Sequence, residues 1–132
     1  MAPAEEPTAA TPPPPHFVIV PLVAQGHTIP MVDFARLLAE RGARASIVTT
    51  PANGARLRGV ADQAARAKLG LEVVELPFPT GVDGLPPGIE NLDQVTDNNH
   101  FTPLFDALWR LAGPLEAYLR ALAARPSCIV SD

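Results

Sequence analysis

Hydrophobic residues along the chain alternate between short continuous runs and spaced stripes. A continuous apolar run occupies residues 17–20, and short apolar stretches lie within 45–50, 71–76 and 127–131. Such stretches are typical of strands that are buried in a sheet. Between the runs, apolar residues recur every three or four positions, as they do on one face of a helix. This alternation predicts an α/β domain: a Rossmann-like, doubly wound parallel sheet with helices on both faces.

The first helix is expected to begin at Pro30, because the first helical position does not need an N–H donor. Gly42 is expected to end it. The apolar spacing predicts that one stripe of this helix faces the sheet. That stripe consists of Met31, Phe34, Ala35 and Leu38.

The later helices are predicted from caps and breakers. Asn53 is expected to cap a second helix that runs to about Lys68. Two more helical segments, 91–111 and 114–124, are expected on either side of the pair Gly113-Pro114.

Two stretches lie outside this alternation. Residues 1–15 are rich in Pro and Ala and have no apolar period, so they are predicted to be a tail without packed contacts that precedes a domain at 16–132. Residues 77–90 are rich in Pro and Gly. This stretch is long for a plain connection, so it is either a functional loop or a surface excursion.

Composition narrows the class of protein. The chain has 132 residues and a formal net charge of -4, which fits one domain and lacks the basic footprint of a nucleic-acid-binding protein. No apolar run approaches the roughly 20 residues of a membrane span, and no secretory signal begins the chain, so a cytoplasmic location is expected. The single cysteine, Cys128, lies in an apolar run and is expected to be a small buried hydrophobe.

Two polar residues are predicted at the edge of the sheet where ligands bind in such folds. His27 follows the first strand, and Asp132 ends the fourth. A carboxylate can fix the tautomer of an imidazole, whose other nitrogen then accepts a proton from a hydroxyl. Spacing alone leaves two alternatives open: His27 as a solvated or capping residue, and Asp132 as a turn former.

Other chemistries have less support in the sequence. The loop after the first strand contains only Gly26, so the dinucleotide-binding fingerprint is missing, and no P-loop or nucleophile elbow occurs. The histidines, cysteine and carboxylates show no metal-ligand spacing. Neither a metal nor a cofactor is therefore expected.

The run HFVIVPLVAQGHTIPMVDFARLLAERG at residues 16–42 resembles the opening of plant UDP-dependent glycosyltransferases of family 1. Its specific part is the Pro-x-x-Ala-Gln-Gly-His-x-x-Pro core at 21–30. The likeness continues, in order, through SIVTTPANGAR, LEVVELPFP, GLPPGIENLD and RPSCIVSD. It covers nearly everything after the first 15 residues.

The resemblance implies the N-terminal half of a GT-B fold, truncated after the fourth strand. Residues 16–132 would be an incomplete acceptor-binding domain, and the C-terminal domain that holds the UDP-sugar is absent. The UDP-sugar is a co-substrate and not a cofactor. The implied reaction transfers its sugar, with inversion and without a metal, to a hydroxyl of a small acceptor such as a plant secondary metabolite or hormone.

The family's residue roles map onto four positions. His27 would be the general base, and Asp132 would orient it. Gln25 and Gly26 would contact substrate. The full-length protein is expected to be a cytoplasmic monomer.

Two rival hypotheses follow from the missing donor domain. The chain is either an inactive truncated fragment or a non-catalytic small-molecule-binding domain. With its fourth strand uncovered, the isolated chain is expected to be marginally stable or to aggregate, and to transfer no sugar.

Overall fold

The computed structural model describes residues 12–132, so most of the predicted tail, residues 1–11, lies outside the described residues. Residues 12–15 are exposed. The Pro15 carbonyl nevertheless accepts a hydrogen bond from the Arg44 N–H at 2.8 Å. Contact with the sheet therefore begins one residue before the expected domain boundary.

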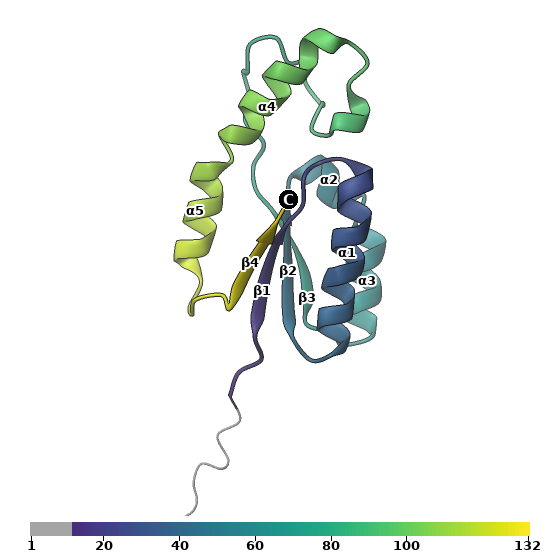
Figure 1. The fold of residues 1–132 in the computed structure, drawn as a ribbon, viewed down its shortest axis with the longest axis vertical. Coiled ribbons are helices and arrows are strands. Elements are labelled where there is room, and N and C mark those ends of the chain that lie inside the picture. Colours follow the sequence, from purple (N-terminus) through teal and green to yellow (C-terminus); the bar gives the residue numbers. More distant parts are fainter. Residues whose placement is uncertain (1–11) are drawn as a thin grey trace, which may run out of the picture.

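A four-stranded parallel sheet forms the centre of the molecule, in the order β3-β2-β1-β4 (Figure 1). The strands are β1 (His16–Val20), β2 (Arg44–Thr49), β3 (Leu71–Glu75) and β4 (Cys128–Ser131). Each strand begins and ends within one residue of the prediction, and the parallel direction is confirmed.

Helices lie on both faces of this sheet. The helices are α1 (Gln25–Glu40), α2 (Pro51–Ala55), α3 (Arg58–Arg66), α4 (Phe101–Trp109) and α5 (Ala112–Ala121), with 3-10 turns η1 (Leu92–Gln94) and η2 (Asn98–His100). Figure 1 shows α1 and α3 on one side of the sheet, α5 on the other, and α4 beyond the carboxyl ends of the strands. This arrangement confirms the predicted Rossmann-like α/β class. No helix within residues 12–132 is both long and apolar enough to cross a membrane.

The alternation of side chains along the strands separates two apolar layers. Ile19 and Ile47 face α1 and α3, where they pack with Ala35. Val18 and Val48 face the other way and contact α5. Each of these side chains is almost fully buried, and burying one Val or Ile contributes about 1.5–3 kcal/mol to stability.

The start of α1 was predicted wrongly, and its buried stripe was predicted correctly except at Phe34. The helix begins at Gln25 and not at Pro30, which lies inside the helix. Ala35 is buried, and Met31 and Leu38 pack against the core, but the expected core residue Phe34 is 40% exposed. The buried residues of the helix are Val32, Ala35 and Ala39. Two of those three residues are alanines, whose small side chains let the helix lie close to the sheet.

Other helix boundaries also differ from the prediction. The expected helix from Asn53 to Lys68 is divided into α2 and α3, and residues 91–100 of the expected 91–111 helix form only the turns η1 and η2 before α4 begins. Asn53 is buried inside α2 and is not its cap, because Thr50 takes that place and Pro51 fills the first helical position. The break between the last two helices lies at 110–111, and Gly113-Pro114 falls in the first turn of α5. A proline is tolerated there because first-turn N–H groups need no partner within the helix.

The fourth strand is more exposed than its apolar sequence predicts. Cys128, expected to be buried, is exposed, and Ile129 is 50% exposed. Among the described residues β4 pairs only with β1, so its other edge is uncovered. An apolar run predicts burial only if something packs on the strand.

Candidate active site

The candidate site lies at the carboxyl ends of β1 and β4. In this sheet β2 and β4 lie on opposite sides of β1, so the direction of strand addition reverses there. Such a reversal leaves a crevice at the carboxyl ends of the two strands, which is where open α/β sheets bind ligands. The loop at 21–24 leads from β1 into α1, and Asp132 directly follows β4.

The structure brings His27 and Asp132 together across 105 residues of sequence. The His27 Nδ1 and Asp132 Oδ2 atoms are 2.7 Å apart. His27 lies in the first turn of α1, and not in the loop before the helix as expected from the sequence. An ionised carboxylate only accepts hydrogen bonds, so Nδ1 must carry the proton, and Nε2 is then free to accept one.

A second hydrogen bond fixes the carboxylate. The Leu22 N–H donates to Asp132 Oδ1 at 2.8 Å. This backbone bond is the main reason that the pKa of Asp132 lies below its usual value; the His27 contact also lowers the pKa, while partial burial opposes the shift. Asp132 is therefore ionised at neutral pH and held at two points.

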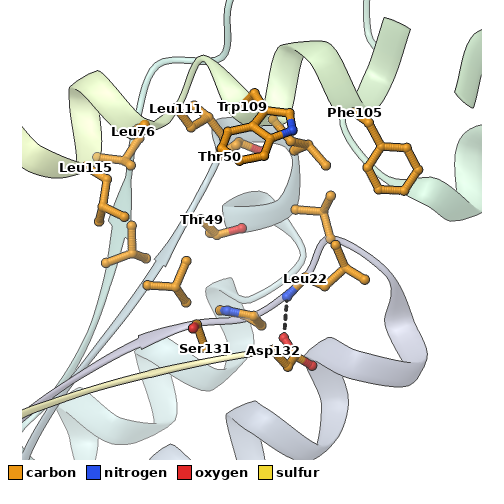
Figure 2. A pocket seen from close by; sticks show the side chains of 16 residues that line it. Leu22, Thr49, Thr50, Leu76, Phe105, Trp109, Leu111, Leu115, Ser131 and Asp132 are labelled. Atoms are coloured by element: carbon orange, nitrogen blue, oxygen red, sulfur yellow. Dashed lines mark hydrogen bonds between the residues drawn. The ribbon is translucent and has the colours of Figure 1, made fainter. Parts of the chain in front are cut away.

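An apolar cavity of about 400 Å³ opens beside this carboxylate (Figure 2). Its walls come mainly from Val and Leu side chains of the strand ends, the 21–23 loop and the start of α5. Thr49, Thr50, Ser131 and Asp132 supply the polar side chains of the lining. A mostly apolar cavity with a few convergent polar groups is typical of a small-molecule site.

Two aromatic side chains of α4 form the far wall of the cavity. Figure 2 shows Trp109 and Phe105 across the cavity from Asp132. Trp109 is 79% exposed and Phe105 is 44% exposed. Trp109 therefore lies on the rim of the cavity, with its indole free for contact.

Gln25 and Gly26, the other two candidates, begin α1 but do not line the cavity. Both residues are exposed. A Cβ added at Gly26 would meet nothing within 4 Å, so packing within residues 12–132 does not require glycine there. The structure therefore places these residues near His27 but outside the cavity lining.

Sequence reasoning missed a polar cluster beside the start of α1. The Gln25 N–H donates to Asp93 Oδ2 at 2.8 Å, and the neighbouring Asn91 is only 2% exposed. Asn91 and Asp93 lie in the GLPPGIENLD segment at 84–93. This segment is part of the family resemblance, but no role was assigned to its residues. The sequence does not show that Asn91 is buried, so it offered no signal by which this cluster could have been recognised.

Residues 12–132 contain no group of three or more His, Cys, Asp or Glu side chains positioned to hold a metal ion.

Known proteins similar to this chain are plant glycosyltransferases. No protein-family model matches the chain. UDP-glycosyltransferases 73C3 and 73C6 of Arabidopsis thaliana are 43% and 45% identical to it over 117 residues. The match covers 89% of this chain and 24% of each relative. The chain therefore spans about a quarter of the length of these curated relatives.

Solved structures give the same result for the fold. UGT73P12 of Glycyrrhiza uralensis, in complex with glycyrrhetinic acid 3-O-monoglucuronide, matches with a TM-score of 0.82 and 32% identity over 90% of this chain and 24% of that protein. Arabidopsis thaliana UGT89C1, in complex with quercetin, matches with a TM-score of 0.77 and 28% identity over 90% of this chain and 29% of that protein. The chain has the fold of the N-terminal portion of a GT-B glycosyltransferase.

Proposed function

We propose, from the relationship of this chain to the plant UDP-glycosyltransferases, that it is the acceptor-binding part of an enzyme that moves a sugar from a UDP-sugar to a hydroxyl of a small molecule with inversion. The observation that carries the proposal is the His27–Asp132 pair, 2.7 Å apart, beside an apolar cavity. Donor binding belongs mainly to a second domain outside this chain.

The pair prepares one nitrogen for base catalysis. Asp132 accepts the Nδ1 proton of His27, so Nε2 keeps its lone pair for the acceptor hydroxyl. When Nε2 takes that proton, an imidazolium forms beside an ionised carboxylate. The two opposite charges stabilise each other, which lowers the free energy of the charged state.

The reaction is a single displacement. As His27 removes the hydroxyl proton, the acceptor oxygen attacks the anomeric carbon of the sugar from the face opposite UDP. The new C–O bond forms while the bond to the UDP oxygen breaks, and UDP leaves with that electron pair. Attack from the opposite face inverts the anomeric configuration.

The cavity lining favours a flat or polycyclic apolar acceptor with a hydroxyl at one end. Leu and Val side chains, together with the exposed faces of Phe105 and Trp109, would cover the apolar body of such a molecule. Its hydroxyl would lie at the polar end, near Asp132 and His27. Quercetin, which the UGT89C1 complex contains, is a flat molecule that carries hydroxyl groups.

The test is kinetic and uses the full-length protein to which we propose this chain belongs. His27→Ala should lower kcat/KM for a phenolic or aliphatic acceptor by about 10²–10⁴-fold, the usual contribution of a general base. UDP affinity should stay unchanged. The matched control is His100→Ala, because His100 lies in η2, away from the cavity lining.

Three outcomes separate the hypotheses. Near-wild-type turnover of an aliphatic alcohol by His27→Ala would end the general-base assignment. Loss of UDP binding would move His27 to the donor site. Acceptor binding without sugar transfer by the unmodified protein would favour the non-catalytic binding domain.

A further inference from the structure

Helix α1 lacks a cap of its own. Its N-cap residue, Ala24, has no side-chain hydrogen bond to offer, and its first turn contains no acidic residue. The backbone N–H groups of a first helical turn have no partners within the helix and need them from elsewhere. His27 lies in this turn, so whatever satisfies these groups also affects the imidazole.

The missing cap comes from 68 residues further along the chain. The Gln25 N–H donates to Asp93 Oδ2 at 2.8 Å. A carboxylate at a helix N-terminus is also favoured by the helix dipole. The adjacent Leu92 N–H donates to the Val23 carbonyl at 2.8 Å. Residues 91–93, which we call the clasp, are therefore bonded both to the β1–α1 loop and to the first residue of α1.

The clasp is itself held from the interior. Asn91 accepts a hydrogen bond from the Asp93 N–H through Oδ1 at 2.8 Å. Its Nδ2 donates to Asn53 Oδ1 at 2.8 Å. Asn91 and Asn53 are 2% and 6% exposed, and the bonds of buried amides are costly to break.

The same chain of bonds reaches the end of β2. Asn53 Nδ2 donates to Thr50 Oγ1 at 2.7 Å and to the Glu90 carbonyl at 2.9 Å. Thr50, which directly follows β2, is 1% exposed and also lines the cavity. The clasp therefore connects the rigid end of the sheet to the first turn of α1.

We propose that Asp93 is a positioning residue for His27. Its carboxylate, although remote in sequence, caps α1. It thereby fixes the first turn in the position at which His27 Nδ1 contacts Asp132. The inference rests on the proposed function, because it assigns Asp93 a role in the same reaction. Asp93 does not line the cavity, so its contribution is to the alignment of the base and not to acceptor binding.

Two substitutions break the same hydrogen bond from opposite sides. Asp93→Ala removes the acceptor. Gln25→Pro removes the N–H donor at the first helical position, where proline is well tolerated, and Ala24 already has the extended backbone that precedes proline. Gln25→Ala keeps the N–H and measures separately what the glutamine side chain contributes, since the family resemblance assigns that side chain to substrate contact.

In the full-length protein, each bond-breaking variant should lower kcat by about 10- to 100-fold, since displacement of a catalytic group by about 1 Å can cost that much. In Asp93→Ala, the acceptor KM and the affinity for UDP should stay unchanged, because Asp93 does not line the cavity. The double variant should be no slower than either single one, and Asp93→Asn, which keeps an oxygen acceptor, should recover most of kcat. Asp97→Ala is the matched control, because the side-chain contacts of Asp97 stay within its own turn, with the Asn99 N–H and the His100 ring.

A further measurement does not depend on turnover. Nitrogen NMR of the His27 ring should show that the Nδ1-protonated tautomer is less populated in Asp93→Ala than in the unmodified protein. Wild-type kcat in Asp93→Ala, alongside an inactive His27→Ala, would overturn the positioning role and leave the proposed function intact. An active His27→Ala would instead overturn the proposed function. The inference would also be overturned if the loss of kcat in Asp93→Ala were fully explained by a smaller fraction of folded protein and Asp93→Asn did not recover kcat.

Discussion

At the scale of single residues, Asp132 uses its two carboxylate oxygens for two different donors. Oδ1 accepts from the Leu22 N–H, and Oδ2 contacts His27 Nδ1. The first bond fixes the carboxylate to the β1–α1 loop, and the second selects the imidazole tautomer. A side chain with only one oxygen cannot serve both donors.

Asp132→Asn tests this double role in the full-length protein. An amide would turn its NH₂ group toward either Leu22 or His27, and it could not offset the imidazolium charge. We expect kcat/KM to fall by about 10²-fold for an aliphatic alcohol, toward the lower end of a general-base effect. The loss should be smaller for a phenol, whose pKa of about 10 makes proton removal easier.

The measurement is kcat/KM for one acceptor of each kind, with UDP affinity measured in parallel. Asp106→Asn is a suitable control, since Asp106 is exposed on α4 and does not line the cavity. Equal losses for the phenol and the alcohol would contradict the charge argument.

At the scale of elements, three strands are joined by polar side chains at their amino ends, opposite the candidate site. His16 Nε2 of β1 lies 2.7 Å from Ser46 Oγ of β2. That hydroxyl donates to Glu72 Oε2 of β3, also at 2.7 Å. Because the Ser46 proton points to Glu72, the imidazole donates to Ser46 and does not act as its base.

This cluster favours a neutral histidine and an ionised glutamate. Burial lowers the pKa of His16, and the nearby Arg44 lowers it further, against the opposing effect of Glu72. Burial alone would raise the pKa of Glu72, but hydrogen bonds from Ser46 and Arg44 outweigh it, so that the pKa lies below its ordinary value.

A pH-dependent stability follows from His16. Its pKa in the folded chain is below the ordinary 6.5, so the unfolded chain takes up this proton first as pH falls. The contribution of His16 to the free energy of unfolding is therefore complete above pH 6.5 and is lost as pH falls toward the folded pKa. His16→Gln, which can still donate to Ser46, should remove this part of the pH dependence.

Urea unfolding of both proteins, from above pH 6.5 to about one unit below it, measures the difference. The Glu72 contribution has the same sign but belongs to more acid solutions, because its ordinary pKa is 4.5. Parallel curves for the two proteins across the histidine range would show that His16 does not titrate as argued.

At the scale of the whole molecule, β4 is the open side of the sheet among the described residues. Ile129 is 50% exposed and, with Leu119 and Leu122, borders a shallow apolar hollow beside α5. An edge strand with apolar side chains is a template for pairing with another chain. The isolated 132-residue chain is expected to self-associate through this edge.

Ile129→Lys should reduce that association, because a charged side chain on an edge strand opposes pairing. Sedimentation at several protein concentrations, under reducing conditions because Cys128 is exposed, would measure the change. Leu37→Lys is the matched control: Leu37 is 56% exposed on α1, away from the edge. A monodisperse wild-type monomer, or an equal effect of both substitutions, would contradict the prediction.

The sequence by itself determined the strands and their parallel direction, and it indicated His27 and Asp132 as candidates for the site. Short apolar runs predict buried strands because the spacing of apolar residues and the local composition can be read from neighbouring positions in the sequence. Each strand was predicted to within one residue of its observed ends. His27 and Asp132 could be selected because both follow strands that a parallel sheet must align at one edge. Their contact at 2.7 Å agrees with that expectation.

Only the tertiary structure decided where α1 begins, which side chains are exposed and what holds the site. The start of α1 could not be read locally because its cap, Asp93, lies 68 residues away. Phe34 and Cys128 are exposed although their neighbours suggest burial, since burial depends on what packs against a surface. The cavity likewise exists only because α4, the strand ends and the 21–23 loop converge in space.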